Sequence, residues 1–162
     1  MVDRQRSEVY AAEFAAFDGT DLEDVQPLDE ALALVVAVTT GEWWPGPEVR
    51  AIAMRSDAES SCARAVGDAV EVRIATPQAT WATVAHELAH ALAGVANGHG
   101  PMFRRALLDV IEVVTNGCIG GPTGPRRGRL HVDQLRATFA AADLAVSERS
   151  WPAPESGAPF AL

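Results

Sequence analysis

The spacing of hydrophobic and polar residues changes several times along this chain, and each change predicts a different element of secondary structure. Helical spacing predicts helices over 6–17, from residue 28 to a stop near Gly41, over 76–94, from Pro101 onward and over 130–146. Alternation predicts a strand over 48–56 and a hairpin over 61–75 that turns at Gly67-Asp68. An acidic linker over 18–27 and a Gly- and Pro-rich loop over 116–129 are expected to be irregular.

Positions within these patterns predict which side of each element is buried. In the first helix, Tyr10, Phe14 and Phe17 fall at i, i+4 and i+7 and predict one apolar stripe. The helix that begins at residue 28 is apolar nearly all round, so we expect it to be buried. The second strand of the hairpin alternates, and its buried face is predicted to consist of Val70, Val72 and Ile74.

The composition is typical of one globular domain. The 162 residues are 48% hydrophobic and 22% charged, which suits a chain with a sizeable core. We predict a single domain over 1–146 and an irregular, Pro-rich tail over 147–162. The longest apolar run, over 31–38, is too short to cross a membrane, and the first residues form no apolar signal segment. A cytoplasmic location without a membrane partner is therefore expected.

Charge and cysteine content narrow the possible partners and metal sites. A net charge of −9 argues against a general nucleic-acid surface, because phosphates are bound by a local positive field. The two cysteines, Cys62 and Cys118, form no C-x-x-C pair, which argues against a zinc site built from thiolates. The oligomeric state is not indicated by the sequence.

The helix expected over 76–94 contains the motif H-E-x-x-H at His86, Glu87 and His90. On a helix, residues four apart are offset by about 40° and about 6 Å, so the two imidazoles project from one face, one turn apart. Both can reach one zinc ion at about 2.0–2.1 Å per bond. Glu87 lies one step round the helix, where it can act as a general base on a metal-bound water without being a ligand. Thr76 is predicted to cap this helix and Gly94 to end it.

A catalytic zinc needs a third protein ligand and one open position. His99 is the favoured third ligand, because a helix that ends at Gly94 leaves enough chain for a return to the metal, with Asn97-Gly98 as the turn. Glu112 on the next helix is a rival third ligand, and Asp109 is a weaker one. His99 is closer in sequence and needs no special crossing of two helices.

The same stretch also has an interpretation without a metal. A histidine on an apolar helix is more often a core or surface residue than a ligand, and H-E-x-x-H is short enough to occur by accident. Here the apolar positions lie on a face separate from the histidines and consist of Trp81, Val84, Leu88, Leu92 and Val95. This separation, with a third histidine at workable range, favours a metal site.

The block "HELAH…HGPMF" resembles the SprT-like and related minigluzincin zinc peptidases, in which an H-G-x-x-F segment supplies the third histidine. Together with the N-terminal "RSEVYAAE", it is also similar to a family of small actinobacterial and actinophage metallohydrolases. The resemblance implies a zincin-like (minigluzincin) α+β domain with a small, mostly antiparallel sheet. It implies Zn²⁺ bound by His86, His90 and His99, with Glu87 as the catalytic base. It also implies that the strand over 69–75 is the edge along which an extended peptide lies.

Other residues carry weaker signals. Tyr10, the only tyrosine, is expected to pack in its helix stripe, although its segment belongs to the resemblance and an approach to the site stays open. His131 is expected at the surface, with stabilisation of an oxyanion as the alternative. Trp43 and Trp44 beside Pro45 predict a packed corner. A solvated loop, with anion or nucleic-acid contact as the alternative, is expected for Arg126, Arg127 and Arg129.

The favoured function is that of a zinc-dependent hydrolase, a metallopeptidase acting on a peptide or protein. A non-catalytic, zinc-stabilised binding or accessory protein is the alternative, and hydrolysis of a non-peptide amide is a third possibility. Glu87 favours a hydrolase, because a structural zinc site has no need of that acid. No residue is assigned to the oxyanion on sequence alone.

Overall fold

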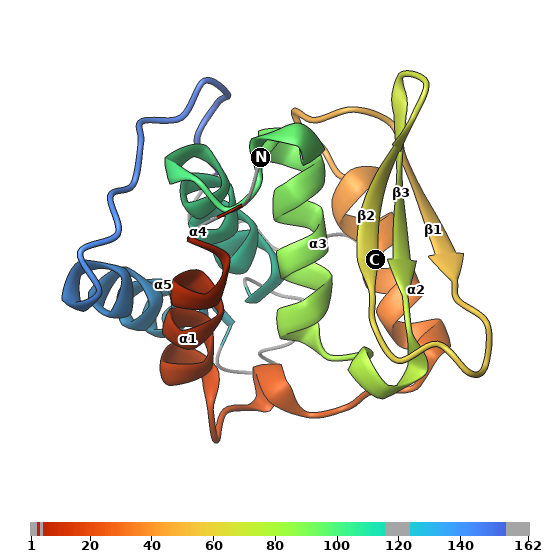
Figure 1. The fold of residues 1–162 in the computed structure, drawn as a ribbon, viewed down its shortest axis with the longest axis horizontal. Coiled ribbons are helices and arrows are strands. Elements are labelled where there is room, and N and C mark those ends of the chain that lie inside the picture. The colour runs from red at the N-terminus through yellow and green to blue at the C-terminus, as the bar shows by residue number, and fades with distance from the viewer. Residues whose placement is uncertain (1–2, 4, 116–123, 155–162) are drawn as a thin grey trace.

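The chain folds into a single α+β domain in which α3 lies between a group of helices and a small sheet (Figure 1). The computed structural model describes residues 3, 5–115 and 124–154, with the backbone alone over 124–129. The helices are α1 (Arg6–Phe17), α2 (Leu28–Thr39), α3 (Trp81–Ala93), α4 (Pro101–Thr115) and α5 (Gly124–Ala141). The strands are β1 (Val49–Ala53), β2 (Cys62–Val66) and β3 (Ala69–Ile74), and short 3-10 helices cover η1 (Asp21–Glu23), η2 (Thr76–Gln78) and η3 (Val95–Asn97).

The sheet is mixed, with the order β1-β3-β2. β3 pairs in parallel with β1 and antiparallel with β2, so that Val72 lies opposite both Ala51 and Ala63. The turn at Gly67, whose φ of 61° favours glycine, folds β3 back between the other two strands. The prediction of a mostly antiparallel sheet is therefore wrong for one of its two pairings. The prediction that 69–75 forms an edge is also wrong, because β3 is the central strand and β1 and β2 are the edges of the described sheet.

The interior is formed where α3 packs against α4 on one side and against the sheet on the other. On the sheet, Val70, Val72 and Ile74 are buried as predicted. On α3, Val84 and Leu88 are fully buried, whereas Trp81 and Leu92, and Val95 of η3, are only partly covered. α2 buries Ala31, Leu34, Val35 and Val38 but leaves Val36 49% exposed, so it is buried on one face and not all round.

α1 has the predicted bounds but buries a different face from the predicted one. Phe17 is fully buried, whereas Tyr10 is 43% and Phe14 62% exposed. The stripe expected from these three aromatic residues is therefore wrong. The buried face consists of Val9, Ala12, Glu13, Ala16 and Phe17. The helix is rotated so that the carboxylate of Glu13 points inward, where His86 is its partner.

Two helix starts also differ from the sequence prediction. α3 begins at Trp81, because Thr80, and not Thr76, is its cap: the Thr80 hydroxyl oxygen accepts a hydrogen bond from the Thr83 N–H at 3.0 Å. Thr76–Gln78 forms the separate turn η2. α5 begins at Gly124, so the second half of the loop predicted over 116–129 is helical. Residues 116–123, with Cys118, and the side chains of Arg126, Arg127 and Arg129 lie outside the described residues.

The segment after α5 has no helix or strand up to residue 154, yet side chains of α4 hold it in place. The Asp109 carboxylate accepts hydrogen bonds from Arg149 at 2.9 Å and from the Trp151 indole at 2.8 Å. Farther on, the Trp43 indole donates to the Pro152 carbonyl at 2.9 Å, and Trp43 packs edge-on against Trp44. The packed corner predicted at the two tryptophans is confirmed. Residues 155–162 of the predicted tail lie outside the described part of the chain.

Within the part of the chain that the structure describes, no helix has both the length and the apolar character needed to cross a bilayer.

Candidate metal centre

The end of α3 and the turn after it bring the three predicted ligands together. His86 and His90 project from one face of α3, one turn apart. As predicted, the helix ends at Gly94, whose φ of 98° is disfavoured for residues with a side chain. η3 then reverses the chain, and α4 begins at Pro101, as predicted. His99 lies between these two elements and points back to α3.

The imidazoles of His86, His90 and His99 form the one group of at least three potential metal ligands found among the described residues. One ligand atom from each histidine lies within 4.8 Å of the others, and the Nε2 atoms of His86 and His99 are 3.2 Å apart. Phe103 of α4 contacts all three rings, with centroid distances of 4.5–4.9 Å. The aromatic ring forms an apolar floor under the cluster and limits how far the imidazoles can rotate.

Two carboxylates hold the histidine rings from behind. The Nδ1–H of His86 donates to both oxygens of Glu13, at 2.8 and 2.9 Å. The Nδ1–H of His99 donates to Asp3 at 2.5 Å, and the His99 backbone N–H donates to the same oxygen at 3.0 Å. Each bond fixes the tautomer that leaves Nε2 free to bind a metal, as carboxylate partners of metal-bound histidines do. A Cβ at Gly98 would lie 2.8 Å from this Asp3 oxygen, so the glycine leaves room for the contact.

The geometry between His86 and His99 fits a bound cation. Because each ring donates through Nδ1 to a carboxylate, the two Nε2 lone pairs face each other at 3.2 Å. Such an approach is favourable only with a cation or a shared proton between the two nitrogens. His90 adds a buried Nδ1 that has no hydrogen-bond partner. Three imidazoles with an unsatisfied interior are a donor set that suits zinc.

Burial favours the neutral, metal-binding form for two of the three candidate ligands. It lowers the pKa of His90 to about 3, and the neighbouring charges of His86 and His99 act in the same direction. Burial also lowers the pKa of His99, against the effect of Asp3. For His86, burial is outweighed by the charge and hydrogen bond of Glu13, so its pKa is raised. The proton that His86 can accept without a metal occupies the position that a cation would take.

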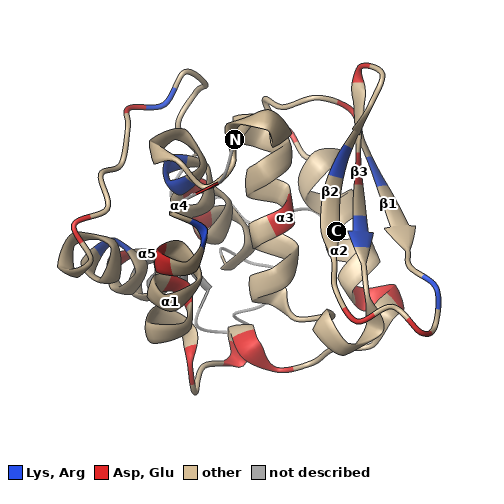
Figure 2. Ribbon diagram, viewed as in Figure 1, with Lys and Arg blue, Asp and Glu red and all other residues tan. Residues whose placement is uncertain are grey.

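Glu87, the one acidic residue of α3 (Figure 2), lies beside the cluster without belonging to it. Its side chain is buried, with only 6% of the residue exposed. Burial raises the pKa of Glu87 to about 7, the charge of Glu13 adds to the rise, and His86 and a hydrogen bond with the Ala63 backbone oppose it. A carboxyl with this pKa can both accept and release a proton near neutral pH.

Arg104 of α4 connects the His99 loop to the residue before α1 and to the segment after α5. Its side chain is almost completely buried. The guanidinium donates through Nη1 to the His99 carbonyl and to Gln5 Oε1, both at 3.0 Å, and through Nε to the Ala145 carbonyl at 2.7 Å. The third ligand is therefore held through its backbone as well as through its ring.

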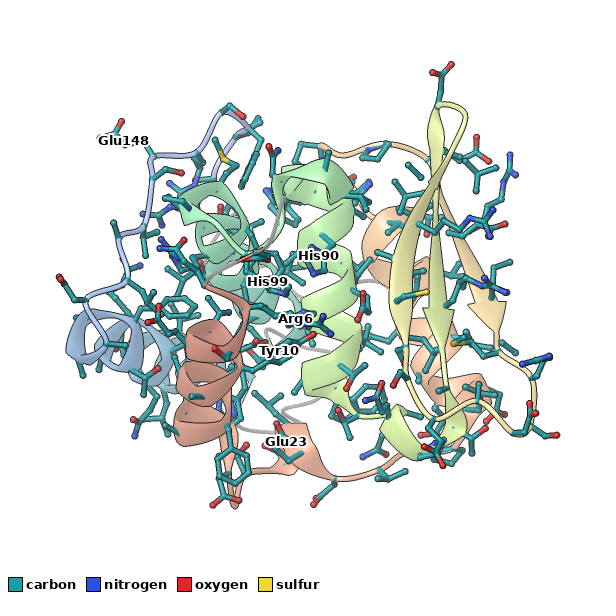
Figure 3. The ribbon with its side chains drawn as sticks, in the orientation of Figure 1. Arg6, Tyr10, Glu23, His90, His99 and Glu148 are labelled. Atoms are coloured by element: carbon teal, nitrogen blue, oxygen red, sulfur yellow. The ribbon has the colours of Figure 1, made fainter. Side chains whose placement is uncertain are left out.

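Two residues of α1, Arg6 and Tyr10, lie over the cluster and reach from α1 toward α3 beside His90 and His99 (Figure 3). The Tyr10 ring stacks on the His86 ring, with 5.0 Å between centroids and 12° between planes, and lies 5.3 Å from the His99 ring. The Arg6 guanidinium carbon is 5.6 Å from the Tyr10 centroid. The predicted packing role of Tyr10 in an apolar stripe is wrong, because the ring packs on a candidate ligand instead.

The rivals for the third ligand lie elsewhere. Asp109 is bound by Arg149 and Trp151, and neither Asp109 nor Glu112 belongs to the cluster found among the described residues. His131 is not at the surface as predicted: it is buried, packs edge-on against Phe17 and has Nε2 3.5 Å from Asp21.

Sequence reasoning missed Asp3 and Glu13, which lie 96 and 73 residues from their histidines. The signal for Glu13 was available in α1, where this acid is flanked at helical spacing by Val9, Ala12, Ala16 and Phe17. An acid on the apolar face of a helix needs a buried partner.

Comparison with models of known protein families, with curated proteins and with solved structures finds no match to this chain. The resemblance to SprT-like zinc peptidases stays a prediction from the motif.

Proposed function

We propose that this protein is a zinc-dependent hydrolase, specifically a metallopeptidase, with His86, His90 and His99 as the zinc ligands. The observation that carries the proposal is the position of Glu87. This carboxyl is buried next to three converging imidazoles and is held outside their set. A purely structural zinc site would have no use for such a group.

The donor set supports a catalytic zinc site over a structural one, in which protein ligands fill every position. Among the described residues the cluster offers three protein ligands, the number typical of catalytic zinc, which keeps a fourth position open. Zinc held there would supply a Lewis acid that polarises the substrate carbonyl. Glu13 and Asp3 orient two of the ligands and make them more basic.

Glu87 performs the proton transfers of the reaction. It takes a proton from the water that attacks the carbonyl carbon, and it gives that proton to the nitrogen as the C–N bond breaks, so that an amine and a carboxylic acid leave. Burial raises the pKa of Glu87 to about 7 in the metal-free protein, so this carboxyl is more basic than an exposed glutamate. Buried surroundings keep the carboxyl in place for both steps.

The edge strand β2 supports an extended peptide as the substrate. β2 is an edge of the described sheet and contacts α3, and its Ala63 backbone is hydrogen-bonded to Glu87. A peptide added along this edge would run past Glu87 and the histidine cluster. β2 thus takes the docking role that the sequence suggested for the strand over 69–75.

The test combines metal analysis with turnover of a peptide library by the wild type and by Glu87→Gln. We expect one zinc per chain in both proteins and turnover by the wild type alone, because the variant keeps the ligands and loses the base. Full zinc occupancy without wild-type turnover of any peptide or amide would reject the hydrolase and favour a zinc-stabilised binding protein. Equal turnover by both proteins would reject Glu87 as the base.

A further inference from the structure

We propose that Arg6 and Tyr10 form a pair of hydrogen-bond donors that binds the carbonyl oxygen of the scissile bond as it becomes an oxyanion. This inference rests on the proposed hydrolase activity and adds to it two catalytic residues from α1. None of the residues assigned above to α3 or α4 is placed to donate to that oxygen. His131 packs against Phe17 and has Asp21 as its neighbour, so it does not supply the donor. Hydrolysis of an amide needs such a donor, because negative charge develops on the carbonyl oxygen.

The Tyr10 ring is fixed in place by the cluster itself. It stacks nearly parallel on His86 and contacts the His99 ring, whose Nε2 atom lies 3.2 Å from that of His86. The hydroxyl lies within electrostatic range of Glu87. Glu87 and the Tyr10 ring are therefore both neighbours of His86. A phenol stacked on a ligand also needs little reorganisation during the reaction.

Arg6 places a positive charge beside Tyr10. Its guanidinium lies over the Tyr10 ring and is hydrogen-bonded to the Tyr10 side chain. Its charge also acts on His86, Glu87 and His90 of α3 and lowers their pKa values. No ion pair joins Arg6 to a carboxylate among the described residues, although this acidic chain offers many carboxylates. An exposed arginine without a carboxylate partner is available to an anion that arrives with the substrate.

The position of Tyr10 indicates which negatively charged group of the substrate Arg6 and Tyr10 would bind. The substrate atom nearest the histidine cluster in a zinc hydrolase is the scissile carbonyl oxygen. The Tyr10 ring is 5.0 Å from the His86 ring and 5.3 Å from the His99 ring, which places it beside the group that would react. The donor pair is therefore assigned to the reacting carbonyl and not to recognition of a charged side chain or chain end.

Tyr10→Phe tests the hydroxyl alone, because the variant keeps the ring that stacks on His86. We expect kcat to fall about 100-fold, with KM changed less than about twofold and zinc content unchanged. Arg6→Gln is expected to lower kcat about 10-fold, and Arg6→Lys to keep part of the activity. Phe14→Leu, at an exposed position one turn farther along α1, is the matched control and should keep wild-type kcat.

A binding measurement gives a second readout that needs no turnover. Acetohydroxamate, a small zinc-binding probe with a carbonyl oxygen, is titrated by calorimetry into the zinc-loaded proteins. Loss of the Tyr10 hydroxyl should weaken its binding about 5- to 10-fold, and Phe14→Leu should leave it unchanged.

Three results would overturn the inference. The first is a Tyr10→Phe protein with wild-type kcat and wild-type affinity for the probe. The second is an Arg6→Gln effect confined to KM and to peptides that carry a free carboxylate, which would make Arg6 a receptor for charged substrates. Both leave the hydrolase standing. The third is a zinc-loaded wild type without any turnover, which would reject the hydrolase and this inference together.

Discussion

Carboxylates that accept hydrogen bonds from distant side chains occur at two places in the helical half of the molecule, and their partners differ. Asp109 on α4 is bound by the Arg149 guanidinium through two hydrogen bonds and by the Trp151 indole through a third. Glu13 and Asp3 are bound by imidazoles, whose second nitrogens point away from the carboxylates and toward one another. In the Asp109 cluster the negative charge meets a full positive charge on the same chain.

The comparison separates a closed polar network from an open one. Every donor that faces Asp109 belongs to the protein, so this cluster needs nothing further and serves to hold the segment after α5. In the histidine cluster two carboxylates accept from the Nδ1 atoms of His86 and His99, and a cation between the Nε2 atoms would complete the arrangement. Changes at the two places should therefore affect different properties, metal affinity at one and metal-free stability at the other.

The largest effect is expected for His99→Ala, which removes the proposed third ligand. Zinc affinity should fall about 1000-fold, or about 4 kcal/mol, because two remaining imidazoles cannot hold the ion as tightly. Competition with a chromophoric chelator measures this directly. Glu112→Ala is the matched control and should keep wild-type affinity. Loss of zinc from Glu112→Ala, with zinc retained by His99→Ala, would reverse the assignment.

Asp109→Ala should instead lower the free energy of unfolding by about 3 kcal/mol, because Arg149 and Trp151 lose their shared acceptor. Urea denaturation of the metal-free protein measures the loss. Glu148→Ala, at an exposed position next to Arg149, should change stability by less than about 0.5 kcal/mol. The zinc content of folded Asp109→Ala should stay at one per chain. A large drop in its zinc affinity would contradict the assignment of stability to the Asp109 cluster and of metal affinity to the histidine cluster.

Glu13→Gln should weaken zinc binding about 10- to 100-fold, which corresponds to about 1.4–2.7 kcal/mol. The amide oxygen can still accept from His86, but it no longer supplies the charge that makes the ring more basic. Glu8→Gln, on the exposed side of α1, serves as the control in the same chelator competition. Unchanged zinc affinity in Glu13→Gln would reduce Glu13 to a packing residue.

The smallest effect concerns Glu87 in metal-free protein. Its pKa is raised to about 7 in the folded state, above the ordinary value of 4.5. A carboxyl shifted in this direction stabilises the protein below the lower pKa, and this contribution is lost as the pH rises through the folded value. At pH 8, Glu87→Gln should therefore be more stable than the wild type by about 1–2 kcal/mol, with a much smaller difference at pH 5. Denaturant titrations at both pH values in the presence of a chelator would show whether the gain depends on pH.

Local features of the sequence were sufficient to predict the ligand-bearing part of the site. The H-E-x-x-H spacing, the stop at Gly94 and the start at Pro101 all act within one or two turns of helix, and the structure has them where the sequence indicates. Gly67-Asp68 specified the hairpin in the same way. That these histidines bind zinc stays a prediction.

Features that depend on distant partners were not predictable in this way. Glu13 is buried because His86 lies opposite it, and counting apolar residues therefore selected Tyr10 and Phe14 for the wrong face. β3 is the central strand because β1 pairs with the edge of β3 that is opposite β2. Alternation of apolar and polar residues along a strand does not indicate which strands lie beside it. Thr76 and Thr80 are both plausible caps, and only the geometry of η2 decides between them.

Assembly of the histidine cluster depends on two carboxylates, Asp3 and Glu13, that are synthesised well before their histidine partners. Asp3 and Glu13 leave the ribosome early, yet their partners follow 96 and 73 residues later. Closing loops of this length requires residues far apart in the sequence to meet, whereas the hydrogen bonds of α3 are local. A nascent chain can therefore form the H-E-x-x-H helix before either carboxylate has docked. A metal ion would then meet the two histidines of that helix first as a loose, two-ligand site, and would be held firmly only once His99 and the N-terminal segment have docked.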